Sequence, residues 1–286
     1  MTSSSAQRFL TAHTGFSVPS IGLGTYKLNG SFGTAAILQA AEVGYRYFDS
    51  AVNYGNEDAV GLAVQQMVER GIAPREELIV ASKLPGRDHE YESALHSIEE
   101  SLYRSGLEYL DVYLIHWPNP IVDKYVEAWA ALIEAQKRGY VRHIGVSNFE
   151  PQHIDRLERE TSVVPVINQV EMHPYFPQSD LLEYNTSRGI ITQAWSPLVR
   201  AGELLGSEVI HRVARTWGIT PAQVVLRWHV QRGVMPIPKA TSLQRQQENL
   251  DVFDVLLSED DMNAIATLAH NNGRMKGQDP TVYQEF

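Results

Sequence analysis

Apolar runs alternate along this chain with stretches that have the period of amphipathic helices. Each run has the length of a buried strand, is rich in β-branched, leucine and aromatic residues, and closes on polar side chains. The runs cover residues 21–26, 46–51, 78–84, 109–117, 141–148, 166–173, 190–198 and 234–240. Because most intervals between them fit one strand–helix unit, the pattern predicts an α/β fold of repeated βα units.

Two of the intervening segments carry clear helix signals. Residues 91–106 place four apolar side chains on one face and end at Gly106. Residues 220–233 begin with Thr220 in the N-cap position, and Gln223 completes a capping box. The second segment occupies the longest interval between strands, so we expect an additional helix there.

Eight βα units in a chain of 286 residues favour a (β/α)8 TIM barrel over a doubly wound sheet. No composition shift or flexible linker divides the chain, so we expect a single domain over residues 1–286. Residues 1–17 precede the repeat and are predicted to cover the bottom of the barrel. Residues 263–286 follow it and are predicted to form a mobile C-terminal tail.

Composition limits the kinds of binding partner and the cellular compartment that we expect for this chain. A formal net charge of -10 argues against nucleic acid and anionic membrane surfaces, which require a cationic face. The chain contains no cysteine, which excludes disulfides and thiolate chemistry and suits a reducing cytoplasm. It also contains neither a signal-peptide pattern nor a long apolar span. We therefore expect a cytoplasmic protein that acts on small molecules.

Side chains that can carry charge or exchange protons lie where several of the apolar runs end. Asp49, Lys83 and His116 each terminate such a run, although an unpaired charge at a buried strand is costly. In a TIM barrel these ends meet at one rim, where active sites lie. An ion pair of Asp49 with Lys83 beside the phenol of Tyr54 would ease ionisation of that phenol. Tyr54 could then protonate a carbonyl oxygen while His116 orients or polarises the carbonyl.

The motifs in this order resemble those of the aldo-keto reductase family. The similarity covers about residues 18–257 and includes GLGTYKL, YRYFDSAVNYGNE, LDVYLIHWP, IGVSNF, NQVEMHPY, WSPL and IPKATSLQRQQENLDVFD. It looks nearest to prokaryotic members of the 2,5-diketogluconate reductase type. The resemblance implies that Asp49, Tyr54, Lys83 and His116 form a catalytic tetrad and that the chain reduces aldehydes and ketones, including keto-sugar acids, as a monomer.

The resemblance also implies NADPH as the cofactor. Ser147, Asn148 and Gln169 would bind the nicotinamide carboxamide, and Trp195 would stack on the ring. The remaining positions implied along the same site are Gly24, Thr25, Ser196, Leu198, Lys239, Thr241, Ser242, Arg245 and Asn249.

One part of this cofactor site can be interpreted without the family. A capping box from Thr241 to Gln244 is expected to open a helix, and Lys239 and Arg245 beside its N-terminus suit a 2'-phosphate. Ala240 stands where relatives often have serine, which removes one phosphate hydrogen bond. For the substrate pocket we expect Tyr26, Tyr54, Trp117 and the C-terminal segment as walls.

Other classes fit the sequence less well. The GxG of GLGTYK lacks the third glycine of a Rossmann fingerprint, and no tyrosine has the lysine partner of a short-chain dehydrogenase. There is no HExxH, so His173 is expected to be a hydrogen-bonded loop residue and no metal site is expected. The alternative from another class is an NADPH-binding sensor or accessory subunit with little turnover.

Overall fold

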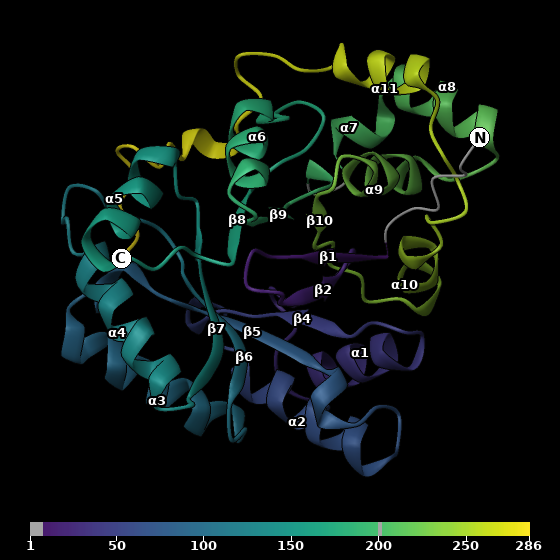
Figure 1. Cartoon of the computed structure of the whole chain (residues 1–286). Coiled ribbons are helices and arrows are strands. Elements are labelled where there is room, and N and C mark those ends of the chain that lie inside the picture. Colours follow the sequence, from purple (N-terminus) through teal and green to yellow (C-terminus); the bar gives the residue numbers. More distant parts are fainter. Residues whose placement is uncertain (1–7, 200–201) are drawn as a thin grey trace.

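The computed structural model describes residues 8–199 and 202–286 and contains a parallel eight-stranded sheet (Figure 1). Neighbours in this sheet follow one another in the sequence, as in a TIM barrel, which confirms the predicted fold class. Its strands are β3 (Leu23–Gly24), β4 (Tyr47–Asp49), β5 (Ile79–Leu84), β6 (Leu110–Ile115), β7 (Val141–Ser147), β8 (Ile167–Glu171), β9 (Ile191–Trp195) and β10 (Met235–Pro236).

Backbone hydrogen bonds between the first and last strands close the barrel. The amide of Gly22 donates to the carbonyl of Pro236 at 3.2 Å, and that of Gly24 to Pro238 at 3.1 Å. Both acceptors are prolines, which have no N–H to return, and this explains why β10 is short. A Cβ on Gly24 would lie 3.0 Å from the carbonyl oxygen of Ile237, so glycine permits this close approach.

Helices surround the sheet, and two of them show the end signals that the sequence predicts. Gly106 terminates the third helix in the left-handed conformation at φ 64°, and Thr220 and Gln223 form both bonds of the predicted capping box. The helices are α1 (Gly30–Glu42), α2 (Glu57–Glu69), α3 (Tyr91–Ser105), α4 (Tyr125–Lys137), α5 (Pro151–Thr161), α6 (Ser179–Ser187), α7 (Glu203–Gly206), α8 (Glu208–Trp217), α9 (Pro221–Gln231), α10 (Leu243–Leu250) and α11 (Glu259–Ala266).

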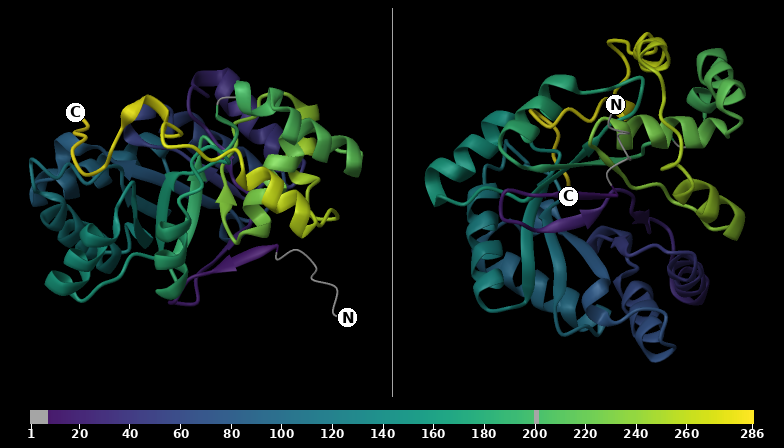
Figure 2. Two further views of the ribbon diagram at one scale, coloured as in Figure 1. Left: turned by 90° about the horizontal axis from the view of Figure 1, so that it is seen from above. Right: turned by 45° about the vertical axis from the view of Figure 1, so that its right-hand side comes forward.

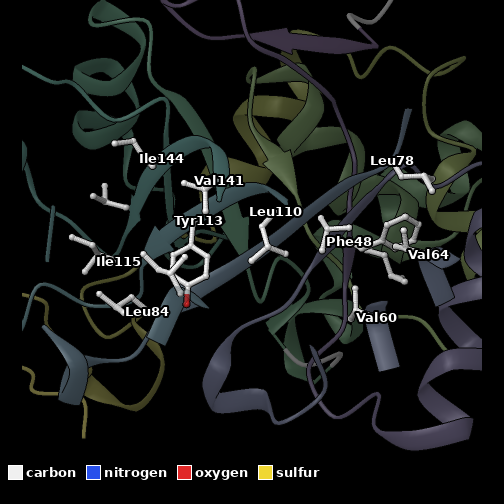
Figure 3. Close-up of a cluster of buried hydrophobic side chains, with 14 of the residues drawn as sticks. Phe48, Val60, Val64, Leu78, Leu84, Leu110, Tyr113, Ile115, Val141 and Ile144 are labelled. Carbon is white, nitrogen blue, oxygen red and sulfur yellow. The ribbon is translucent and has the colours of Figure 1, made fainter. Parts of the chain in front are cut away.

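The main hydrophobic core lies between the outer face of the sheet and these helices (Figure 3). Phe48 of β4 and Leu110 of β6 belong to it, as do Val60 and Val64 from one face of α2. Burying side chains of this size stabilises the fold by about 1.5–3 kcal/mol each. The core therefore fixes the strands whose ends carry the polar residues.

The N-terminal hairpin closes the bottom of the barrel. It consists of β1 (Phe9–Thr11) and β2 (Ser17–Pro19), and its Leu10 and Val18 pack among apolar side chains from the strands. This supports the expected cover for residues 8–17, whereas residues 1–7 lie outside the described residues. At the opposite end the C-terminal segment crosses the barrel (Figure 2). Helix α11 continues past Asn263, so the extended tail begins after Ala266.

Candidate active site

A buried ion pair lies at the carboxyl ends of two adjacent strands. The ammonium of Lys83 on β5 donates to both carboxylate oxygens of Asp49 on β4, at 2.8 and 2.7 Å, and to the carbonyl of Ser50 at 2.7 Å. The side chain of Lys83 is fully buried, and that of Asp49 is 6% exposed. Burial lowers the pKa of Lys83, and the nearby Asp49 carboxylate opposes that shift. These three acceptors use all three donors of the ammonium.

Tyr54 stands above this pair in the 3-10 turn η1 (Val52–Tyr54), which follows β4. Its hydroxyl is 3.5 Å from the Lys83 nitrogen, the longest of the contacts around that nitrogen. Burial raises the pKa of Tyr54 well above 10.0, and Asp49 and Glu285 add to the rise. The expected net easing of ionisation of the phenol is therefore wrong, because burial and the negative charges of Asp49 and Glu285 outweigh the nearby Lys83 ammonium. The phenol keeps its proton across the neutral pH range and is available as a donor.

Aromatic side chains from other strand ends lie close to the ring of Tyr54 and to one another. The ring of His116, directly after β6, meets the Tyr54 ring edge to face at 6.0 Å. The ring of Tyr26, after β3, lies 5.1 Å from Tyr54 in a similar orientation. The rings of Trp117 and Trp195 meet edge to face, with their centroids 6.5 Å apart. The predicted convergence of strand ends thus brings the four proposed catalytic residues and the predicted pocket walls Tyr26 and Trp117 together.

Amide side chains connect the next strand ends into a network. The indole N–H of Trp195 donates to the side-chain oxygen of Asn148 at 2.8 Å, and the Asn148 amide donates to the carbonyl of His116 at 2.9 Å. The Gln169 amide donates to Asp49 at 2.7 Å and to Gln193 at 3.1 Å. These bonds fix the indole and the amides before any ligand arrives.

Asn148 and Ser196 are among the residues of this region that adopt left-handed backbone conformations. Asn148 has φ 62° directly after β7, and Ser196 has φ 48° directly after β9. Left-handed backbone is unfavourable for residues with a side chain, more so for serine than for asparagine. Strained backbone of this kind is concentrated at functional sites. Here it turns the chain sharply at the rim of the barrel, directly after β7 and β9.

Cations lie at the far end of the same region, where β10 leads into α10. Lys239 and Arg245 are exposed there, and within residues 8–199 and 202–286 neither has a carboxylate partner. The N-cap of α10 is Ser242, whose hydroxyl accepts from the amide of Arg245 at 3.4 Å, so the capping box expected at Thr241 is wrong by one residue. The side chain of Gln244 instead donates to Glu248.

A cavity of about 680 Å³ joins these groups. The predicted residues that line it are Gly24, Tyr26, Asp49, Tyr54, His116, Trp117, Asn148, Gln169, Trp195, Ser196, Leu198, Lys239 and Arg245. Lys83 lies behind its wall, paired with Asp49. The others do not line the cavity: Thr25, Ser147, Thr241, Ser242 and Asn249.

The cavity also has wall residues that were not named individually from the sequence. They are Lys27, Asn53, Pro197, Ile237, Pro238, Gln278, Tyr283 and Glu285. Several neighbour predicted residues along the chain, so proximity to a strand end would have found them. Gln278, Tyr283 and Glu285 belong to the C-terminal segment, which was expected as a wall, although no local pattern marks these three residues. His173 is a hydrogen-bonded loop residue as expected, with its Nε2 2.9 Å from Glu171.

The donor set of the cavity fits a nicotinamide dinucleotide phosphate. Trp195 offers an indole face of fixed orientation, Asn148 and Gln169 offer amides, and Lys239 and Arg245 offer unpaired positive charge. An aromatic face suits a flat heterocycle, amides suit a carboxamide, and cations at a helix N-terminus suit a phosphate. In a protein of net charge -10, such local cations are needed to hold an anionic ligand.

Comparisons with known proteins agree with this geometry. A family model described as "Aldo/keto reductase family" matches residues 20–270. The chain is 48% identical to 2,5-diketo-D-gluconic acid reductase B of Corynebacterium sp., covering 93% of this chain and 94% of that one. It is 43% identical to a glyoxal reductase of Bacillus subtilis, covering 94% of each. A solved NADPH complex of a Gox0644 mutant has a TM-score of 0.90 and 40% identity, covering 98% of this chain and 99% of that one.

Removing the charge of Asp49 tests the buried pair. We expect Asp49→Asn to lower the free energy of unfolding by about 3–5 kcal/mol, because Lys83 is left buried without its counter-charge. Urea denaturation measures this loss. The control is Glu208→Gln, which breaks an exposed pair with Arg215 and should leave the unfolding midpoint unchanged. Equal midpoints for Asp49→Asn and the unaltered protein would contradict the account.

Proposed function

We propose that this chain, which belongs to the aldo/keto reductase family, uses Tyr54 as the general acid of its reaction. It is an NADP-dependent oxidoreductase that reduces carbonyl compounds to alcohols. Bound NADPH supplies the hydride for this reduction. The observation that carries the assignment is the Tyr54 hydroxyl, which borders the cavity with Lys83 at 3.5 Å and His116 beside it.

In this proposal each residue of the tetrad has a separate task. Tyr54 donates its proton to the carbonyl oxygen as the alcohol forms, and the resulting phenolate lies beside the Lys83 ammonium. Asp49 holds Lys83 in place and balances its charge before the proton moves. His116 donates a hydrogen bond to the carbonyl oxygen and orients it toward Tyr54. Solvent then returns a proton to the phenolate.

The cofactor would lie along the cavity from Trp195 to Arg245. We assign Trp195 and Asn148 to the nicotinamide end, with Gln169 behind them. Lys239 and Arg245 would hold the 2'-phosphate beside the α10 N-terminus. Gly24, Ser196 and Leu198 line the path between these ends.

The other predicted cofactor residues support the site from behind. Thr25 donates to the carbonyl of Asp49 at 2.8 Å, and Ser147 donates to that of Gln169 at 2.8 Å. Ser242 caps α10. Thr241 is exposed and Asn249 is buried, and we retain them as proposed contacts of the adenosine end.

For the substrate we propose small aldehydes and ketones, including keto-sugar acids. The relatives named for diketogluconate and glyoxal reduction support this range, and Tyr26 and Trp117 offer aromatic walls for a short carbon chain. We further propose that residues 1–286 act as one domain and as a monomer in the cytoplasm. The lack of cysteine supports the compartment. In the described residues no helix is both long and apolar enough to cross a bilayer.

Removing the Tyr54 hydroxyl tests the acid. Tyr54→Phe keeps the ring and should lower kcat by about 10²- to 10⁴-fold, the range of general acid catalysis, with NADPH affinity nearly unchanged. Steady NADPH consumption with methylglyoxal and a panel of carbonyl compounds measures kcat. Tyr103→Phe, on an exposed tyrosine of α3, is the matched control. Near-normal turnover by Tyr54→Phe would remove this residue from the role, and NADPH binding without turnover by the unaltered protein would favour the sensor alternative.

The difference in affinity between NADPH and NADH tests whether the cationic end of the cavity binds the 2'-phosphate. Arg245→Ala should weaken NADPH binding by about 1.5–3 kcal/mol, the value of a charged hydrogen bond, while NADH loses little because it lacks the 2'-phosphate. Dissociation constants for both cofactors decide the matter, with the exposed Arg215→Ala as control. A parallel loss for NADPH and NADH would indicate structural damage, and no loss for either would place the anion site elsewhere.

A further inference from the structure

The C-terminal tail crosses the mouth of the barrel and reaches the candidate active site (Figure 2). On the way the ring of Tyr283 packs 4.5 Å from that of Trp117. The next two residues of the tail differ sharply in exposure, because Glu285 is 8% exposed whereas Phe286 is 86% exposed. The tail is therefore held in the barrel through Glu285.

The backbone of Glu285 is bound by the segment that follows β6. The side chain of Asn119 donates to the carbonyl of Glu285 at 2.7 Å and accepts from its amide at 2.9 Å, as a neighbouring strand would. A Cβ on Gly86 would overlap both Asn119 and the carbonyl oxygen of Glu285, so glycine at that position leaves room for the tail. Because these contacts use the backbone of residue 285, they do not depend on which side chain it carries.

The carboxylate of Glu285 joins the segments that follow two neighbouring strands. One oxygen accepts from the side-chain amide of Asn53 at 2.9 Å, and the other accepts from the backbone amide of Gly86 at 3.0 Å. Asn53 directly precedes Tyr54 in the turn η1, and Gly86 follows β5, the strand of Lys83. The tail thus connects the turn that carries the phenol to the segment just beyond the buried lysine.

The turn η1 needs such support because it lies outside the strands. None of its three residues is fully buried, so packing in the core fixes it only in part. The side chain of Asn29 donates to the carbonyls of Tyr54 and Gly55, at 3.1 and 2.8 Å. Glu285 adds a second connection through Asn53. A functional side chain on a loop is placed less precisely than one on a strand unless its neighbours hold it.

The position of this turn sets the distance between two groups of the proposed mechanism. The Tyr54 hydroxyl lies 3.5 Å from the Lys83 nitrogen, at the long end of the range for a hydrogen bond. Lys83 itself is fixed, because its side chain is fully buried and paired with Asp49. A small movement of η1 away from Lys83 would therefore break the contact, and a misplacement of about 1 Å can lower a rate by about 10²-fold.

We propose that Glu285 is a positioning residue for Tyr54. Its carboxylate holds η1 through Asn53 and connects this turn, through Gly86, to the segment after Lys83. The tail thereby places the proton donor in addition to forming a wall of the pocket. This inference rests on the proposed function of Tyr54 and goes beyond it, because it assigns the placement of the donor to a residue that is far away in the sequence.

A cycle of variants on the single-turnover rate tests this proposal. The rate of NADPH oxidation by the preformed NADPH complex, mixed with excess methylglyoxal, is compared in the unaltered protein, Glu285→Ala, Tyr54→Phe and the double variant. We expect Glu285→Ala to lose about tenfold, because the donor is misplaced. The double variant should lie within about threefold of Tyr54→Phe alone, because no hydroxyl is left to be placed.

Further measurements show whether the tail and the cofactor site stay in place. In Glu285→Ala the KM for methylglyoxal and the affinity for NADPH should stay within about threefold of the unaltered values, since Asn119 still binds the tail backbone. Gln284→Ala is the matched control, because that side chain accepts from the amide of Val122, and its rate should be unchanged. Asn53→Ala breaks the same connection from the side of the turn and should repeat the loss seen in Glu285→Ala.

Other outcomes would overturn the proposal. An unchanged rate in Glu285→Ala would mean that Asn29 and the backbone hold the turn without the tail. A raised KM with an unchanged rate, or weaker NADPH binding, would mean that Glu285 only lines the cavity. A further loss of similar size in the Tyr54→Phe background would mean that Glu285 acts through another group, such as His116, whose Nδ1 lies 2.7 Å from its carboxylate. None of these results would affect the role of Tyr54, which the Tyr54→Phe variant tests by itself.

Discussion

The buried pair of Lys83 and Asp49 is the constraint on which the site depends. Moving two charges from water into the protein costs several kcal/mol per ion, and the cost is tolerable only with close geometry and further hydrogen bonds. Here the Lys83 ammonium donates to both carboxylate oxygens of Asp49 and to the carbonyl of Ser50. The Gln169 amide donates a further hydrogen bond to Asp49. In the proposed mechanism the pair also fixes the place at which the phenolate forms, because the ammonium lies beside the Tyr54 hydroxyl.

A parallel barrel suits this arrangement because it brings distant segments to one rim. Every strand enters from the bottom, which the N-terminal hairpin closes, and ends at the top, where the chain turns away. At Asn148 and Ser196 the turn uses left-handed backbone, which the hydrogen-bonded network of Trp195 and Asn148 holds in place. The C-terminal tail adds the last components from outside the repeat.

Elements that are marked by a local or repeating sequence pattern could be predicted from the sequence. The strands and the helices at 91–106 and 220–233 follow from periodicity and caps, and Asp49 and Lys83 were recognisable because charges interrupt apolar runs. The predicted N-cap of α10 is wrong by one residue because threonine and serine are both accepted as N-caps and here stand side by side. Glu285 had no local signal, since its contact with Asn53 spans 232 residues. The pKa of Tyr54 was also misjudged, because the balance between burial and several charges depends on three-dimensional packing.

We propose that Lys83 acts through the Tyr54 hydroxyl, and a double-mutant cycle on kcat decides whether it does. The cycle combines Lys83→Met with Tyr54→Phe at saturating NADPH and substrate. If the ammonium serves only to stabilise the phenolate of Tyr54, its removal costs nothing further once the hydroxyl is gone. We expect kcat of the double variant to lie within about threefold of that of Tyr54→Phe alone. Losses that multiply, so that the double variant falls by the product of the two single effects, would contradict it.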